Sequence, residues 1–374
     1  MTDPNLSDAA RIVVKIGSSL LIDADTGALN RPWLESLADE IAGMRQRDQQ
    51  VIVVSSGAIA LGRAYLGMSA GQRRLEELQA AAAAGQILLA RAYQELLDQR
   101  GVQVAQVLLT LDDTENRRRY LNARSTLETL LGLGTVPIVN ENDTVATAEI
   151  RYGDNDRLGA RVAQMVSADC LVLLSDVQGM YDSDPTDDID AQLITRVTEI
   201  TPQMEQQAGL SSTAFGSGGM KTKLAAARIC MSAGCATVIA SGRRMAPLQA
   251  IETGEPCTWF LPGNTPLAAR KHWIAGSLTP RGSLKIDAGA ERALSDGRSL
   301  LPVGVVGVYG NFDRGDAVSV HNMDGQDIAR GLATYSSDDA RRIIGRRSGE
   351  IGQLLGYPGR DELIHRDNLV LLNH

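Results

Sequence analysis

The sequence contains little cysteine, and the pattern of its cysteines predicts neither a disulfide nor a metal framework. Its 374 residues include four cysteines, which form no CxxC pair and have no histidine at metal-ligand spacing. Three of the four lie among apolar residues, which is typical of small buried thiols. The N-terminus shows no secretory signal pattern, and no apolar run is long enough to span a bilayer. We therefore expect a cytoplasmic protein without membrane association.

Lysine is also scarce, and its few positions are informative. Only five of the 37 basic residues are lysines. Three of these five, Lys15, Lys221 and Lys223, lie beside small-residue or glycine-rich turns. An ammonium group is a compact, mobile charge that can follow a phosphate as it moves. The distribution supports, without proving, a phosphate site near these turns.

Length and composition indicate an ordinary globular protein. Hydrophobic residues make up 44% of the chain and charged residues 22%, a balance that suffices to bury a full core. A length of 374 residues suggests two domains, or one large domain with an appendage. The net charge of −8 argues against a protein whose main partner is nucleic acid or an anionic membrane.

Six short β-branched runs, each followed by a small or polar turn, predict strands buried on both faces. They fall at residues 11–19, 49–62, 102–110, 134–143, 168–179 and 234–242. Helix-compatible stretches alternate with them, at residues 32–47, 71–97, 122–131 and 220–233. This alternation predicts an α/β fold with an open, mainly parallel sheet. Ligands of such sheets bind at the carboxyl ends of the strands, where these polar turns fall.

The pattern changes near residue 280. Residues 281–361 combine short strand patterns with frequent glycine turns and Asp-rich loops, which predicts a small β-rich domain. The charge of this C-terminal part is nearly balanced, because residues 281–374 hold 12 Lys and Arg against 13 Asp and Glu. Its basic cluster is RRIIGRR, at residues 341–347.

Two turns at strand ends have the composition of anion sites. Lys15 and Gly17 lie in KIGSS, where glycine lets the backbone approach a ligand and successive N–H groups can form a cradle. Ser55 and Ser56 precede Gly57 at the expected start of a helix, and helix N-termini attract phosphate or carboxylate. Each turn is also consistent with an ordinary strand-to-helix connection that has a Ser or Gly cap.

Residues 214–223, AFGSGGMKTK, form a third candidate. Their glycines, hydroxyls and two lysines resemble a phosphate loop, although no Walker A tripeptide is present and the chain lacks the HRD and DFG motifs. A flexible surface loop is the alternative for this stretch. Asp176 ends another strand, where it could accept from a ribose, help to hold a metal or simply form a turn.

In contrast to the lysine-bearing turns, residues 136–156, VPIVNENDTVATAEIRYGDND, are rich in acidic and amide side chains. A buried-strand pattern runs there into eight acceptor side chains, with Arg151 as the one cation. The acceptors are Asn140, Glu141, Asn142, Asp143, Glu149, Asp154, Asn155 and Asp156. Together with the lysine-bearing turns, the segment predicts a site that holds a polyanion on one side and a cationic amino group on the other.

These motifs together resemble the amino acid kinase family. The resemblance is carried by VVKIGSS, VVSSGAIALG, YLNARST, VPIVNENDTVATAEI, GDND and GGMKTK, at residues 13–19, 53–62, 120–126, 136–150, 153–156 and 218–223. It covers almost the whole chain and implies an αβα sandwich, with the ATP and substrate sites, in residues 1–260. It also implies a PUA domain at residues 281–361, followed by a C-terminal tail at 362–374.

Within the family, NENDTVATAEI combined with GDND is similar to members that phosphorylate the γ-carboxylate of L-glutamate, the first step of proline biosynthesis. The resemblance therefore implies L-glutamate as the substrate and ATP with Mg²⁺ as the phosphoryl donor. It further implies feedback inhibition by L-proline through the glutamate site, and assembly into a homo-oligomer, a dimer or a tetramer.

The resemblance also assigns roles to individual residues. It implies that Lys15 and Lys223 are catalytic and that Asp156 orients them. Ser56, Asp143 and Asn155 fall on positions that bind glutamate. The implied nucleotide contacts are Lys15, Ser175, Asp176, Ser217, Gly218, Gly219, Met220, Lys221, Thr222 and Lys223, and no residue is assigned to a metal. Lys221 stands where a small neutral residue is frequent, which leaves its contact with nucleotide open.

Phosphoryl transfer to a carboxylate is consistent with these residues. All four histidines lie at or beyond position 272, but no general base is needed, because a carboxylate is already ionised at neutral pH. Two lysines and Mg²⁺ can position the reactants and neutralise charge. Asp143 can pair with the α-ammonium of the substrate, Asn155 can bond either α-group, and the Ser56 turn can donate to a carboxylate. We expect Lys223 to be exposed at the site.

Two other hypotheses remain open. The acceptor could be acetylglutamate or another small acid, but an acylated amino group would have no use for Asp143. Alternatively, the chain could bind RNA, because PUA domains often do. The acidic chain and its balanced C-terminal charge weigh against RNA binding, and the RRIIGRR cluster favours it.

Overall fold

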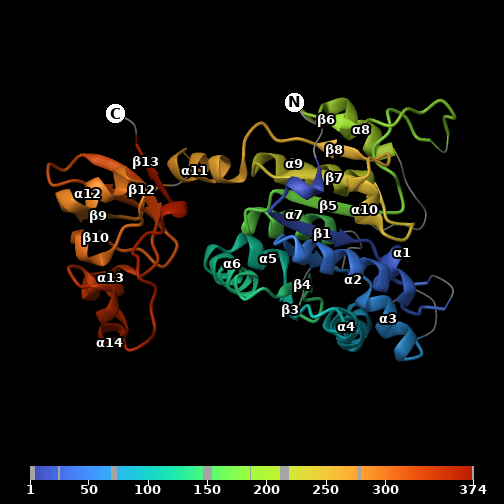
Figure 1. Ribbon diagram of the computed structural model, residues 1–374, viewed down its shortest axis with the longest axis horizontal. Helices are drawn as coiled ribbons and strands as arrows, with labels where there is room; N and C mark the ends of the chain where they lie inside the picture. The colour runs from blue at the N-terminus through green and yellow to red at the C-terminus, as the bar shows by residue number, and fades with distance from the viewer. Residues whose placement is uncertain are drawn as a thin grey trace. The chain divides into compact units, whose positions relative to one another are not determined.

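The chain folds into two compact units, Met1–Pro266 and Leu267–His374. The computed structural model describes residues 5–23, 26–68, 74–145, 154–185, 187–210, 219–276 and 279–372. Figure 1 shows the helices and strands of both units. Within the described residues, no helix combines the length and the apolar character needed to cross a bilayer.

The first unit is built on an eight-stranded sheet with the order β3-β4-β2-β1-β5-β7-β8-β6. Its strands are β1 (Arg11–Ile16), β2 (Gln50–Val54), β3 (Val104–Leu109), β4 (Val136–Glu141), β5 (Cys170–Ser175), β6 (Arg196–Val197), β7 (Ala236–Ser241) and β8 (Thr258–Phe260). The six predicted strands are confirmed as β1 to β5 and β7, and their pairings with one another are parallel. Strand β8 pairs antiparallel with β7 at one edge. The open, mainly parallel sheet predicted from the sequence is therefore confirmed.

Helices cover both faces of this sheet. They are α1 (Ser18–Leu21), α2 (Arg31–Gln46), α3 (Ala58–Tyr65), α4 (Leu75–Asp98), α5 (Leu111–Glu115), α6 (Arg117–Gly132), α7 (Asp154–Met165), α8 (Pro202–Leu210), α9 (Met220–Ser232) and α10 (Pro247–Glu252). One apolar core joins the sheet to α2, α4 and α10, and a second joins it to α6, α7 and α9. The layers therefore form an αβα sandwich.

The side chains of β1 alternate between these two cores, as the period of two in a strand requires. Ile12, Val14 and Ile16 belong to the core under α2, whereas Val13 belongs to the core under α7. Lys15 is two residues from Val13, so its side chain emerges on the α7 face at the carboxyl end of the strand.

The second unit contains a five-stranded sheet with the order β10-β9-β11-β12-β13. Its strands are β9 (Gly282–Ile286), β10 (Val305–Gly310), β11 (Ala317–His321), β12 (Asp327–Leu332) and β13 (Leu369–Leu371), and its helices are α11 (Pro266–Gly276), α12 (Ala288–Ser295), α13 (Ser337–Ile343) and α14 (Ile351–Leu355). Strand β13 pairs with β12, and Ile364 is fully buried. The domain end expected at residue 361 thus lies inside this unit, and residues beyond it are not merely a tail.

Helices α3 and α4 pack with their backbones in direct contact. A Cβ added to Gly62 on α3 would lie 1.7 Å from the carbonyl oxygen of Ala81, and a Cβ added to Gly85 on α4 would lie 1.7 Å from that of Ala58. Both distances are far inside van der Waals contact. The close approach therefore depends on the absence of a side chain at these two glycines.

We predict that Gly85→Ala lowers the free energy of unfolding of the first unit by about 3 kcal/mol, because the helices must separate to admit the methyl group. Gly43→Ala is the matched control, since Gly43 lies within α2 and a Cβ there meets no atom within 4 Å. It should raise stability by about 0.5–1 kcal/mol through helix propensity. Urea denaturation followed by circular dichroism measures both, and equal stability of the two variants would contradict the prediction.

Candidate active site

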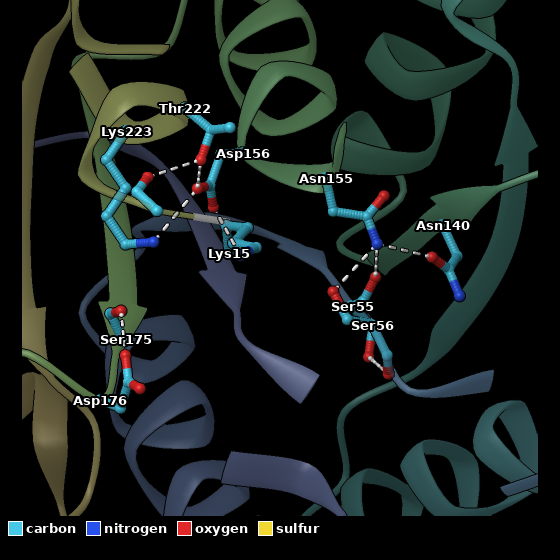
Figure 2. A network of polar contacts seen from close by, with 11 residues as sticks. Lys15, Ser55, Ser56, Asn140, Asn155, Asp156, Ser175, Asp176, Thr222 and Lys223 are labelled. Atoms are coloured by element: carbon cyan, nitrogen blue, oxygen red, sulfur yellow. Dashed lines mark hydrogen bonds and ion pairs between the residues drawn. The ribbon is translucent and has the colours of Figure 1, made fainter. Parts of the chain in front are cut away.

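The candidate site lies at the carboxyl ends of β1, β2, β4 and β5. Because these strands are parallel neighbours in the sheet, the polar residues that follow them meet at one edge. Figure 2 shows two groups of polar contacts there, one around Asp156 and one around Asn155. These two residues are consecutive on the first turn of α7.

Asp156 lies between two lysines. Its Oδ1 is 2.5 Å from Lys15 Nζ and its Oδ2 is 3.3 Å from Lys223 Nζ. The Thr222 hydroxyl donates to Oδ2 at 2.8 Å. The Asp156 side chain is 0% exposed, and those of Lys15 and Lys223 are 8% and 6% exposed. Two ammonium groups and one carboxylate leave a buried excess of one positive charge, which favours an anionic ligand.

The charges of this cluster shift the pKa values of its members. Burial on its own would raise the pKa of Asp156, but the two neighbouring ammonium groups outweigh it and hold that pKa below its ordinary value. Burial lowers the pKa of Lys223, and the attraction of Asp156 opposes this effect. Asp156 therefore stays ionised at neutral pH, which suits an orienting role and not that of a general base.

Three elements bring the cluster together. Lys15 comes from β1 and Asp156 from α7, while α9 supplies Thr222 and Lys223 from its first turn. Gly159 of α7 packs over the lysine stem, since a Cβ at that position would lie 3.4 Å from Lys15 Cβ. The expectation that Lys223 is exposed is wrong, because α9 packs against the core through the neighbouring Leu224.

The second group is centred on the carboxamide of Asn155. Its Nδ2 donates to the Ser55 carbonyl oxygen at 2.9 Å, to Ser56 Oγ at 2.9 Å and to Asn140 Oδ1 at 3.2 Å. Its Oδ1 is buried and has no hydrogen-bond partner among the residues that the structure describes. The amide thus presents an acceptor that a ligand donor could satisfy.

Asp143 follows β4 and is also buried. Burial raises its pKa to about 6, and no salt bridge to it is formed within the described part of the chain. A buried carboxylate without a cation is costly, so the position favours a positively charged ligand group.

Ser175 and Asp176 end β5 on the side of Lys223, away from the Asn155 group (Figure 2). The Ser175 hydroxyl donates to Asp176 Oδ1 at 3.0 Å. Ser175 is buried and Asp176 is half-buried. The pair therefore borders the cationic half of the site.

The predicted glycine-rich loop is described only in part. Ser217 and Gly218 lie outside the described residues, as does Glu149. Gly219 is the N-cap of α9 and makes no side-chain cap, which leaves that helix N-terminus suited to an anion. Met220 is half-buried and Lys221 is exposed.

The structure places two further residues in the hydrogen-bond network of the site: Asn140, to which the sequence assigned no ligand contact, and Gln86, which the sequence did not single out. Asn140 is 2% exposed and holds Asn155, and Gln86 on α4 accepts from Asn140 Nδ2 at 2.8 Å. Asn140 lay within the acceptor-rich segment, which was a signal for it. Gln86 is separated from Asn140 by 54 positions, and its Ala-rich surroundings indicate only a helix.

Known sequences match this chain over nearly its whole length. The sequence model of the amino acid kinase family matches residues 10–241, and that of the PUA domain matches residues 282–355. The chain is 62% identical to the glutamate 5-kinase of Paramagnetospirillum magneticum, with 98% of this chain and 99% of the relative covered. It is 56% identical to glutamate 5-kinase 1 of Rhizobium meliloti, with 98% and 93% covered, and 53% identical to the glutamate 5-kinase of Agrobacterium fabrum, with 99% and 95% covered. The chain therefore belongs to the amino acid kinase family, as a kinase that carries a C-terminal PUA domain.

Proposed function

We propose that the protein transfers the γ-phosphoryl group of ATP to the γ-carboxylate of L-glutamate and so forms L-glutamyl 5-phosphate. The observation that carries this proposal is the placement of Asn155 and Asp156 on one turn of α7. They join a buried cationic cluster to a set of acceptors, around Asn155 and Asp143, that suits an ammonium group. The names of the relatives at 53–62% identity agree with it.

The cationic cluster matches the requirement of the reaction. Attack of a carboxylate on a phosphoryl group brings two anions together, and the protein must hold them in line and neutralise their charge. Lys15 and Lys223 supply that charge from buried, fixed positions, where electrostatic stabilisation is strongest. Asp156 holds both ammonium groups in place and removes no proton.

The elements around this cluster indicate where the nucleotide would bind. The N-terminus of α9 and that of α1, which begins after Gly17, offer backbone N–H groups to the phosphates of ATP. Ser175 and Asp176 border the same side, and residues 217–223 are proposed to contact the nucleotide.

Mg²⁺ fits this site as a companion of ATP. Among the described residues, no group of three or more His, Cys, Asp or Glu side chains is arranged to hold a metal ion. Mg²⁺ does not require such a group, because it keeps water and phosphate oxygens as its main ligands. Asp176 is the carboxylate on the nucleotide side that could contribute one more. When bound, Mg²⁺ supplies charge neutralisation at the phosphates.

The other half of the site selects the amino acid. Asp143 and the Oδ1 of Asn155 are both acceptors, and they suit the α-ammonium of glutamate. Ser56 Oγ accepts from Asn155, so its own proton is left to donate to the α-carboxylate. An acylated amino group carries no charge for Asp143 to neutralise, which favours glutamate over acetylglutamate.

Further features of the proposal rest on the family resemblance. L-proline carries the same α-carboxylate and a cationic nitrogen, so we propose that it inhibits by competing for the glutamate site. We also propose a homo-oligomer that acts in the cytoplasm. RNA binding through the PUA domain is the weakest of the hypotheses, since the acidic chain and the balanced charge of its C-terminal part weigh against it.

The proposal predicts that the purified protein, with ATP, Mg²⁺ and hydroxylamine, forms a hydroxamate from L-glutamate. L-Aspartate and N-acetyl-L-glutamate, assayed at the same concentration, should give little or none. The hydroxamate is measured as its coloured iron complex. A chain that used either competitor in preference to L-glutamate would refute the proposed substrate.

We predict that Lys223→Met lowers kcat about a hundredfold or more, because one of the two transition-state cations is lost. The remaining Lys15 and Asp156 form a one-to-one ion pair, so the melting temperature should not fall. Arg228→Met is the matched control, since Arg228 lies on the same helix but is exposed and pairs with Glu205. Loss of activity that merely paralleled a loss of stability would argue against the role of Lys223.

The raised pKa of Asp143 predicts a pH dependence. In the free enzyme the carboxyl group should protonate as the pH falls through about 6, and the protonated form cannot pair with the α-ammonium. The value of kcat/KM for glutamate should therefore fall below about pH 6, by up to tenfold per pH unit. The inflection in kcat should lie lower, because bound ammonium stabilises the ionised carboxylate.

Asp143→Asn is the control for this profile. It should raise KM for glutamate far more than KM for ATP and should abolish the inflection near pH 6. An unchanged inflection in that variant would assign it to another group.

A further inference from the structure

We propose that Gln86 is a positioning residue that makes the site selective for a substrate with a free α-ammonium group. It would act through Asn140 and Asn155, without touching the substrate itself. This inference rests on the proposed function, since it concerns the amino-acid half of that site.

The three carboxamides form a hydrogen-bonded chain with one direction. Gln86 Oε1 accepts from Asn140 Nδ2 at 2.8 Å, and Asn140 Oδ1 accepts from Asn155 Nδ2 at 3.2 Å. In each link, the oxygen of one amide accepts a hydrogen bond from the NH₂ group of the next amide. The oxygen of Asn155 is left at the end of the chain, buried and without a partner in the described residues.

Backbone groups fix this direction at two points. The Glu141 N–H donates to Asn140 Oδ1 at 2.9 Å, and an N–H cannot accept, so the oxygen of Asn140 must lie on that side. The Ser55 carbonyl accepts from Asn155 Nδ2 at 2.9 Å, and a carbonyl cannot donate. Asn140 must therefore turn its Nδ2 away from Glu141, toward Gln86, and Asn155 must turn its oxygen away from Ser55.

Gln86 is held in place by the packing of α4. Its neighbour Gly85 lies against the backbone of α3, where a Cβ would be 1.7 Å from the Ala58 carbonyl oxygen. Two turns further along α4, the Tyr93 hydroxyl lies 3.0 Å from Ser55 Oγ, and both groups are buried. One face of α4 thus supports the ends of both β2 and β4.

Loss of the Gln86 oxygen would disturb the whole chain. Asn140 is almost fully buried, so its Nδ2 would become an unsatisfied buried donor, which is unfavourable. Movement of Asn140 toward another acceptor would break its contact with Asn155, which would keep its direction through Ser55 and Ser56 but lose one of its three anchors. The Asn155 oxygen would then be held less firmly toward the ammonium of the substrate, whereas a substrate analogue without an ammonium would lose nothing.

The test compares L-glutamate with glutarate, which has the same carboxylates and no amino group. In Gln86→Leu, KM for glutamate should rise about tenfold, while KM for ATP and the inhibition constant of glutarate against glutamate stay within about twofold. Gln86→Glu keeps an oxygen facing Asn140 and should restore KM for glutamate to within about threefold of the wild type. Gln94→Leu is the matched control, since Gln94 is exposed on the same helix.

If Gln86→Leu lowers the melting temperature, Gln86→Met is measured in its place, with the same expected result. The inference is overturned if a folded Leu or Met variant keeps the wild-type KM for glutamate, or if KM and the glutarate constant rise together as in a general loss of structure. It is also overturned if glutamic acid is no better than leucine at position 86. A wild-type protein that forms no hydroxamate from glutamate would instead refute the proposed function, and this inference with it.

Discussion

One buried aspartate shared by two buried lysines is the interaction on which the rest of the site depends. Asp156 is fully buried, so without Lys15 and Lys223 its charge would be too costly to keep. The two lysines exceed the charge of the aspartate, and the excess is stable only because β1, α7 and α9 hold all three groups at the open edge of the sheet. The fold thereby maintains a positive charge where an anion can reach it, and an anion that binds there relieves an imbalance already present in the protein.

The first turn of α7 converts this cluster into a two-sided site. Successive residues of an α-helix point about 100° apart, so Asn155 and Asp156 must face different neighbours. Asp156 faces β1 and α9, and Asn155 faces the ends of β2 and β4 (Figure 2). The distance between the cationic group and the acceptor group is therefore fixed by one peptide unit. The site therefore holds its ammonium-binding group and its cationic group at a fixed distance, which suits a substrate with an ammonium at one end and a carboxylate at the other.

The sequence predicted the sheet well because continuous apolar runs such as residues 11–16 and 170–175 are typical of strands buried on both faces. It also indicated Lys15 and Asp143, because polar side chains at the carboxyl ends of such runs lie at the ligand-binding edge. Asn155 and Asp156 were indicated by the acceptor-rich segment that follows β4. The sequence did not predict α7, whose first turn reads as a polar loop. The burial of Lys223 was missed because only the packing of α9 reveals it. Gln86 was missed because its partner, Asn140, is remote in sequence and its role is set by the contact of α3 with α4.

The two halves of the site are supported from opposite faces of the sheet. The lysine cluster rests on α7 and α9, which share one core, whereas the carboxamide chain ends on α4, which belongs to the other. Glycines 62 and 85 lower the helix propensity of α3 and α4, yet they permit the backbone contact that brings Gln86 to the end of β4. A disturbance of α4 therefore reaches the amide chain directly through Gln86. It reaches Lys15 and Lys223 only through α7, because that helix carries both Asn155 and Asp156.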